Sequence, residues 1–141
     1  MDDQRQRLLI VEDDAWIAIL LASFAGDAGY QVVGPVARLS DACSIAASQP
    51  LDAAVLDVHL LDGALSYPVA DILARRRIPY AFITSEAPDR IADAYSSKPL
   101  LSKPFSDVDF RALLGSRLNQ IQKSSKVARA TADKKFRASL S

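Results

Sequence analysis

The chain has little of what would mark a secreted, disulfide-stabilised or membrane-spanning protein. Its 141 residues include a single cysteine, so no internal disulfide can form. No apolar run approaches the roughly 18 to 20 residues that a membrane-spanning helix needs. The polar stretch 1–7 is not followed by the apolar core of a signal peptide. We therefore expect a cytoplasmic protein without a membrane span.

The net charge is zero, but the charges are distributed unevenly along the chain. Residues 1–115 contain 10 Lys and Arg against 16 Asp and Glu, whereas residues 116–141 contain 7 against 1. This contrast predicts an acidic domain over residues 1–121 and a basic tail over residues 122–141, which is either a helical extension or disordered. Because the tail is too short for a recognised DNA-binding module, we do not expect direct nucleic-acid binding.

Short apolar runs alternate with segments of helical periodicity along most of the chain. The runs lack polar alternation, which is typical of parallel strands buried on both faces. Five repetitions of this pattern predict an α/β fold, a doubly wound five-stranded parallel sheet with helices on both faces. Strands are expected at 8–11, 32–36, 53–56, 79–84 and 99–101, and helices at 15–28, at 40–48 with Ser40 as cap, around 69–77, and after Ser106 as cap.

Residues able to carry chemistry follow four of these strands. Glu12-Asp13-Asp14 follows the first strand, Asp57 the third, Thr84 the fourth and Lys103 the fifth. In a doubly wound sheet, ligands bind beyond the carboxyl ends of the strands, so these side chains should meet at one edge. Each residue alone is an ordinary feature, since acids are also favoured at a helix N-terminus by the helix dipole. The combination indicates a site.

The residue types suit phosphoryl transfer. Clustered carboxylates repel one another unless a hard cation lies among them, and Mg²⁺ prefers such oxygen ligands. A metal ion would neutralise charge that develops on the phosphoryl group. Asp57 would then be the nucleophile, forming an acyl phosphate. Thr84 would donate a hydrogen bond to a phosphoryl oxygen, and Lys103 would pair with another as a point charge.

At these positions residues 7–121 resemble the receiver domain of bacterial response regulators. The resemblance rests on Leu8-Ile10-Val11-Glu12-Asp13-Asp14, Leu56-Asp57-Val58, Thr84, and Ser102-Lys103-Pro104-Phe105. It implies a flavodoxin-like (βα)5 fold and a bound Mg²⁺. It also implies residue roles: Asp57 as phosphoacceptor, Thr84 as switch hydroxyl, Lys103 as the family's lysine, and Glu12, Asp13, Asp57 and the backbone carbonyl of His59 as the metal-binding set.

The chain departs from the common family pattern near its fifth strand. The family usually has Tyr or Phe three residues before the lysine, and this chain has Leu100. The segment between Thr84 and Lys103 is short and weakly periodic, which predicts an atypical fourth helix. These features, with the stretch 79–85, resemble in part an alphaproteobacterial subfamily marked by Pro-Phe-x-Phe-Ala-Thr-Gly. We expect residues 86–98 to be only marginally stable and to change on activation.

The resemblance implies a stand-alone signalling module that takes a phosphoryl group from a histidine kinase or a histidine phosphotransfer protein. Such a module is not an enzyme beyond its own phosphorylation and dephosphorylation. It could also bind another receiver, or a second copy of itself, around the last helix.

Two alternatives remain open. One is an aspartate-nucleophile phosphatase, although His59 stands where that class has a second Asp. The other is a degenerate receiver that only binds partners. Trp16, close to the acids, is expected to pack rather than to overhang the site, and His59 to fill the loop.

Overall fold

The computed structural model describes residues 4–118. Within this range the strands are β1 (Arg7–Val11), β2 (Gln31–Val36), β3 (Ala53–Asp57), β4 (Tyr80–Thr84) and β5 (Leu100–Ser102). The α-helices are α1 (Ala15–Asp27), α2 (Leu39–Ser48), α3 (Tyr67–Arg75) and α4 (Asp107–Ala112), and α4 continues into a π-helical turn, η4 (Leu113–Leu118). Three short 3₁₀ helices complete the order: η1 (Leu61–Gly63), η2 (Pro88–Arg90) and η3 (Asp93–Tyr95).

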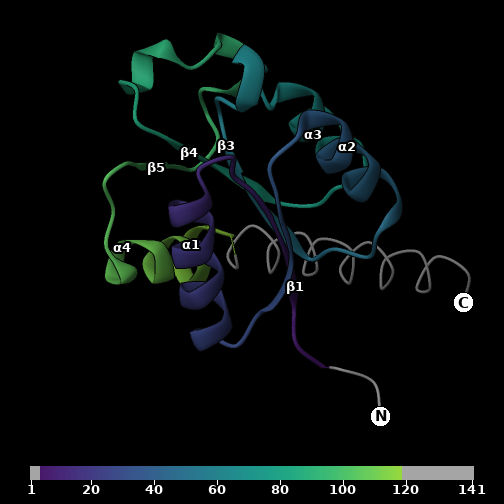
Figure 1. The fold of residues 1–141 in the computed structure, drawn as a ribbon, viewed down its shortest axis with the longest axis vertical. Helices are drawn as coiled ribbons and strands as arrows, with labels where there is room; N and C mark the ends of the chain where they lie inside the picture. The colour runs from purple at the N-terminus through teal and green to yellow at the C-terminus, as the bar shows by residue number, and fades with distance from the viewer. Residues whose placement is uncertain (1–3, 119–141) are drawn as a thin grey trace, which may run out of the picture.

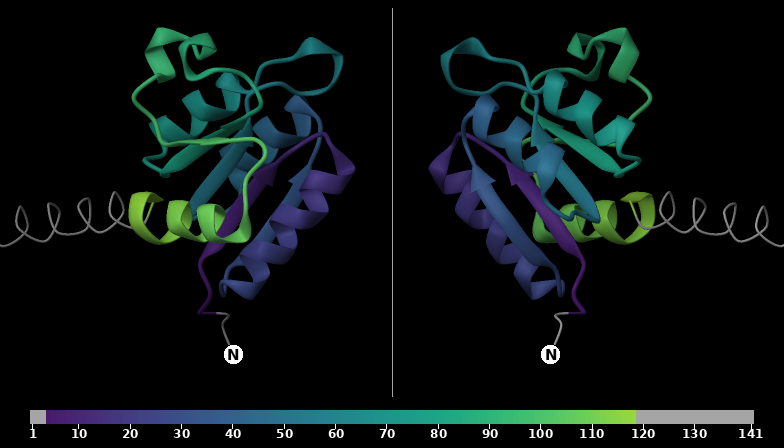
Figure 2. Two further views of the ribbon diagram at one scale, coloured as in Figure 1. Left: turned by 90° about the vertical axis from the view of Figure 1, so that its left-hand side faces the viewer. Right: turned by 90° about the vertical axis from the view of Figure 1, so that its right-hand side faces the viewer.

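The strands form one parallel sheet in the order β2-β1-β3-β4-β5. This is the flavodoxin-like order, so the predicted fold class is confirmed. Helices α1 and α4 cover one face of the sheet, and α2 and α3 cover the other (Figures 1 and 2). The order changes direction at β1, which brings the ends of β1 and β3 side by side.

The core explains why the strand sequences lack alternation. Every residue of β3 and β4 is buried, because helices lie on both faces of these central strands. Alternate residues of β1 point to opposite sides: Leu8 and Ile10 pack with α1 and α4, while Leu9 and Val11 pack with α2 and α3. The predicted burial on both faces is therefore confirmed for β1, β3 and β4, whereas the edge strands β2 and β5 are only partly buried.

Helix boundaries follow the expected signals with two exceptions. Ser106 caps α4 in a capping box with Asp109, as predicted. Ser40 is not a cap, because α2 begins one residue earlier and its N-cap is Arg38, which makes no side-chain cap bond. Within α4, the apolar residue Val108 is 75% exposed although it lies two residues before the buried Phe110. The π-helical turn from Leu113 was not anticipated, and Ile121 lies outside the described residues.

The segment between β4 and β5 contains no α-helix, which confirms the expected atypical fourth helix. It is nevertheless anchored more firmly than its sequence pattern indicates. Ile91 is buried in the core, and the ring of Tyr95 stacks on that of Tyr67 with centroids 4.3 Å apart. The Tyr95 hydroxyl donates to Asp71 Oδ1 at 2.7 Å. Two single turns of 3₁₀ helix are therefore held against α3.

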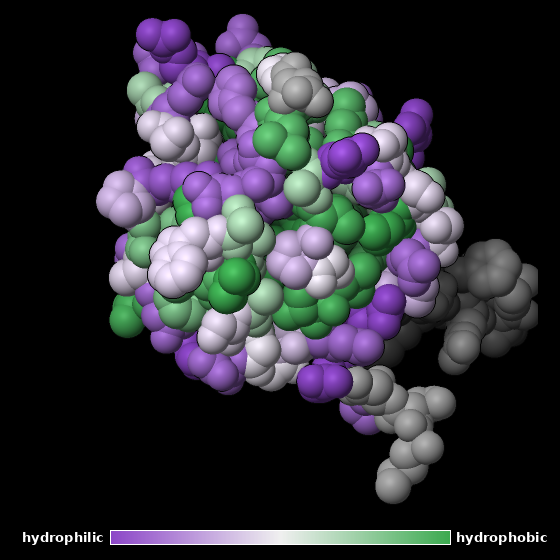
Figure 3. All heavy atoms as spheres, viewed as in Figure 1, coloured by the Kyte–Doolittle hydropathy of each residue, from purple (hydrophilic) through white to green (hydrophobic). Residues whose placement is uncertain are grey.

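Helix α1 is apolar on its outward side as well. Trp16 is 75% exposed and Ile19 is 63% exposed, so the expectation that Trp16 packs inside the protein is wrong. Figure 3 shows one face of the molecule, where hydrophobic surface is bordered by polar residues. Of the helices that the structure describes, none combines the length and apolar character needed to cross a membrane.

Candidate functional site

The predicted site residues meet at the carboxyl edge of the sheet. Glu12 and Asp13 directly follow β1, Asp57 is the last residue of β3, and Thr84 is the last residue of β4. Lys103 follows β5, and its backbone N–H donates to the carbonyl of Thr84 at 2.8 Å. Four strands thus place five side chains, two of them after β1.

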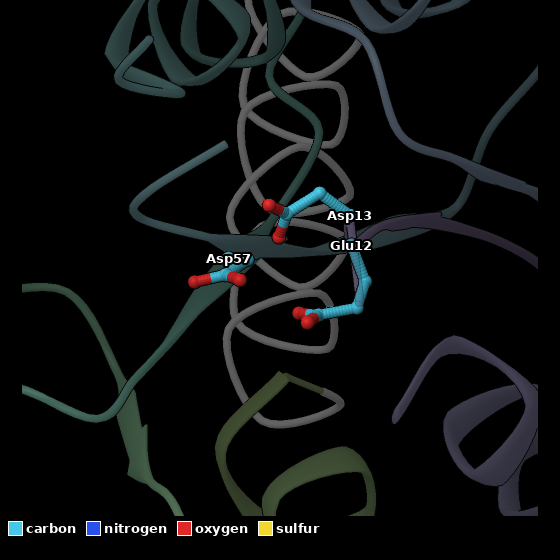
Figure 4. A group of neighbouring side chains, drawn as sticks. All are labelled: Glu12, Asp13 and Asp57. Carbon is cyan, nitrogen blue, oxygen red and sulfur yellow. The ribbon is translucent and has the colours of Figure 1, made fainter. Parts of the chain in front are cut away.

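Three carboxylates form the centre of the site. Glu12, Asp13 and Asp57 each offer an oxygen, and these three oxygens lie within 4.8 Å of one another (Figure 4). Glu12 is 2% exposed and Asp57 is 5% exposed, whereas Asp13 is half-buried. The burial reflects their position at the ends of central strands, where helices cover both sides.

Lys103 partly compensates the charge of this cluster. Its ammonium donates to both oxygens of Glu12, at 3.0 and 3.3 Å, and to Asp57 Oδ2 at 3.1 Å. Burial by itself lowers the pKa of Lys103, but the hydrogen bonds to Glu12 and Asp57 outweigh this and raise the pKa. One ammonium therefore faces three acids and stays protonated.

The pKa values of two of the acids show the effect of burial and of the charge that Lys103 does not compensate. The pKa of Glu12 is raised from 4.5 to about 7, first by burial and then by the hydrogen bond and the charge of Asp57, against the opposing effect of Lys103. The pKa of Asp13 is raised too, chiefly by burial and further by Asp57. Both ionised forms are unfavourable in the metal-free site, and a bound cation would relieve this.

Thr84 and Asp57 are each held by the backbone of a neighbouring residue. The Glu86 N–H donates to Thr84 Oγ1 at 3.0 Å, and the His59 N–H donates to Asp57 Oδ1 at 3.3 Å. The side chains of His59 and Glu86 also meet, with Nε2 and Oε1 2.9 Å apart. His59 thus contacts Glu86 rather than merely filling its loop. The sequence analysis does not predict a role for Glu86, although an acid only two residues after Thr84 is close enough in the chain to lie beside the site.

Asp14 is not part of the carboxylate cluster. Its side-chain oxygen accepts from the backbone N–H groups of Trp16 and Ile17, at 2.9 and 3.1 Å, and so caps α1. The acids after β1 therefore have different tasks: Glu12 and Asp13 face Asp57, and Asp14 starts the helix.

The donor set fits a hard divalent cation. Three carboxylates with oxygens this close are ligands that Mg²⁺ accepts, and the pKa values of Glu12 and Asp13, raised first by burial and further by Asp57, show that a cation would stabilise the ionised acids. Glu12, Asp13 and Asp57 are the side chains that would hold such an ion. The backbone carbonyl of His59 as a further ligand stays a prediction.

Comparisons with known proteins agree with this geometry. SdrG from Sphingomonas melonis Fr1 is 35% identical, with a TM-score of 0.71 over 81% of this chain and 96% of SdrG. The response regulator PhyR from Brucella abortus is 28% identical, with a TM-score of 0.77 over 90% of this chain and 53% of PhyR. The chain belongs to the response-regulator receiver domains.

A curated relative extends the likeness. The phyllosphere-induced regulator PhyR of Methylorubrum extorquens is 29% identical over 120 residues, which is 82% of this chain. This receiver chain spans only 45% of the length of that relative. No family model matches the chain.

Proposed function

We propose that this receiver domain accepts a phosphoryl group on Asp57, with Mg²⁺ bound, from a histidine kinase or a histidine phosphotransfer protein in the cytoplasm. The observation that supports it best is the buried Asp57 carboxylate in contact with Lys103 and adjacent to Glu12 and Asp13. Burying a carboxylate without partners would cost folding free energy, and a cluster of buried charged groups is typical of a functional site.

The chemistry follows from the positions of the side chains. A carboxylate oxygen of Asp57 attacks the phosphorus of the donor, the bond from phosphorus to the donor atom breaks, and an acyl phosphate forms. Mg²⁺ supplies charge neutralisation at the phosphoryl oxygens when it is bound. Lys103 sits 3.1 Å from Asp57 Oδ2 and stabilises the charge of the transferred group. Thr84 Oγ1 accepts from Glu86, which leaves its O–H free to donate to a phosphoryl oxygen.

The acyl phosphate is removed by water, which returns the Asp57 carboxylate and inorganic phosphate. We propose that this is the limit of its catalysis, so the chain is not a turnover enzyme. His59 stands where an aspartate-nucleophile phosphatase has the second Asp as its general acid, and the Nε2 of His59 lies against Glu86. Partial agreement of stretch 79–85 with the Pro-Phe-x-Phe-Ala-Thr-Gly pattern, and the likeness to PhyR and SdrG, support a place in that subfamily.

The phosphodonor would dock beside the acidic site. Helix α1 starts at the Asp14 cap, next to Asp13, and exposes Trp16 and Ile19. It lies beside α4, where Val108 is exposed as well (Figure 1). This apolar surface supports docking by a helical partner, or by another receiver, on the α1–α4 side.

Intact-mass measurement after incubation with acetyl phosphate and Mg²⁺ tests the assignment. Wild type should gain one phosphoryl group and Asp57→Asn none, while Asp41→Asn, an exposed acid on α2, should label like wild type. Equal labelling of Asp57→Asn would refute Asp57 as acceptor. Steady hydrolysis of p-nitrophenyl phosphate would favour the phosphatase alternative, and no labelling at all would favour the binding module.

A second arm tests the metal. Asp13→Asn should weaken Mg²⁺ binding at least about tenfold, since even groups behind the ligands are worth that much. Asp14→Asn removes the same charge one residue away, and asparagine keeps the helix cap, so its affinity should stay close to wild type. Calorimetry measures both. Equal weakening in the two variants would show a general charge effect instead of a ligand.

A further inference from the structure

His59 and Glu86 join two loops that carry the reacting groups. His59 lies two residues after Asp57, beyond β3, and Glu86 lies two residues after Thr84, beyond β4. Their side chains meet at 2.9 Å, although each is partly exposed, at 47% and 41%. The contact therefore joins the loops that follow β3 and β4, beyond the point where the pairing of these strands ends.

The same two residues hold the reacting side chains through their backbones. The His59 N–H donates to Asp57 Oδ1 at 3.3 Å, and the Glu86 N–H donates to Thr84 Oγ1 at 3.0 Å. The result is a continuous chain of contacts from the proposed nucleophile to the proposed hydroxyl donor. Lys103 is held separately, through Glu12, Asp57 and the Thr84 carbonyl.

We infer that the His59–Glu86 contact is a positioning device that fixes Thr84 relative to Asp57 for phosphoryl transfer. The inference rests on the proposed function and goes beyond it by assigning a task to Glu86. Positioned hydrogen-bond donors accelerate a reaction only if they stay where charge develops. Losing the contact should therefore slow both formation and hydrolysis of the acyl phosphate, since in both steps Thr84 donates to an oxygen of the phosphoryl group that is transferred to or from Asp57.

The effect should be modest. Contacts between partly exposed polar side chains are weak, so we expect rate changes of about two- to five-fold. A change of this size needs matched variants, because removing a negative charge near an acidic site by itself speeds the approach of an anionic donor.

The pair Glu86→Ala and Glu86→Gln separates these effects. Both variants lose the charge, but glutamine keeps the length of the side chain and an oxygen that can face His59 Nε2. Phosphorylation by acetyl phosphate and loss of the phosphoryl group are followed by intact mass. Both rates should be about two- to five-fold lower in Glu86→Ala than in Glu86→Gln. Asp89→Ala, which removes an exposed acid in the same segment, measures the effect of losing a charge alone, and both of its rates should not fall below those of wild type.

A double-mutant cycle with His59→Ala completes the test. His59→Ala relative to wild type and Glu86→Ala relative to Glu86→Gln should slow the reactions to a similar degree, and the double variant His59→Ala/Glu86→Ala should be no slower than Glu86→Ala. Equal rates for Glu86→Ala and Glu86→Gln, a faster rate in Glu86→Ala than in Glu86→Gln, or a further slowing in the double variant would overturn the inference alone. Wild type that takes no phosphoryl group would overturn the proposed function and this inference with it. Unfolding midpoints close to wild type confirm that the variants fold.

Discussion

At the scale of single residues, Glu12 is the acid whose ionisation the fold changes most clearly. Its pKa rises from 4.5 to about 7 because it is buried and because Asp57 lies beside it. Lys103 opposes the shift without cancelling it. Glu12 is therefore part protonated near neutral pH when no cation is bound. Binding of Mg²⁺ favours the ionised acid and should release protons.

This shift gives a prediction about stability. Between pH 4.5 and about 7 the folded chain holds more protons on Glu12 than the unfolded chain does. Stability therefore falls as pH rises through that window and levels off above it. Glu12→Gln cannot ionise, so from pH 5 to pH 8 it should gain about 1–3 kcal/mol relative to wild type in metal-free buffer.

Urea unfolding at both pH values, with EDTA present, measures the gain. Adding Mg²⁺ should reduce it, because the cation stabilises wild type with ionised acids and has a weaker site in the variant. Parallel pH profiles for the two proteins would contradict the raised pKa of Glu12.

At the scale of elements, the segment from η2 to β5 shows how an anchored loop can replace a helix. Tyr95 stacks on Tyr67, and Phe82 of β4 presents its ring edge-on to both, with centroids 5.8 and 6.0 Å away. The Tyr67 hydroxyl accepts from the Ala92 N–H at 3.0 Å. The hydrogen bond to Asp71 raises the pKa of Tyr95 to about 12. These three rings already fill this side of the sheet, so no aromatic residue is needed at position 100.

Tyr95→Ala should loosen this segment. It removes the stacked ring and the bond to Asp71, which together should cost about 1–3 kcal/mol of local stability. Tyr95→Phe keeps the ring and should cost less. Hydrogen exchange of residues 86–98 is the measurement, and unchanged protection in Tyr95→Ala would show that the aromatic contacts do not hold the segment.

The same measurement addresses activation. We expect beryllofluoride, which mimics a phosphoryl group, to change protection of residues 86–98, because Glu86 at the start of this segment is bonded to Thr84. Identical exchange of this segment with and without the ligand, with changes elsewhere, would contradict that expectation.

At the scale of the whole molecule, the described core ends before the basic part of the chain. The last buried core residues in the described range are Leu113 and Leu114. The boundary predicted from charge, at residue 121, stays a prediction. A chain ending at residue 121 should have a free energy of unfolding within about 0.5 kcal/mol of that of the full chain. It should also be phosphorylated on Asp57 to the same extent. Lower stability of the shortened chain in urea would show that residues 122–141 contribute to the domain.

The sequence by itself determined the fold class and the candidate site. Unalternated apolar runs require burial on both faces, and parallel strands must end at the same edge. Glu12, Asp57, Thr84 and Lys103 could therefore be placed together from their positions alone. Helix limits were less predictable where local signals were weak, as at Arg38, or where tertiary packing decided them, as at the π-helical turn after α4.

Only the tertiary structure decided how these residues interact. Burial sets the pKa of Glu12, and no sequence pattern states how deeply a strand end lies below its helices. The contact of His59 with Glu86 and the stack of Tyr67 on Tyr95 join residues 27 and 28 positions apart in the chain. Such contacts depend on the spacing of neighbouring loops and on side-chain direction. Periodicity reports which face a residue occupies, and it does not report which side chain from another element it meets.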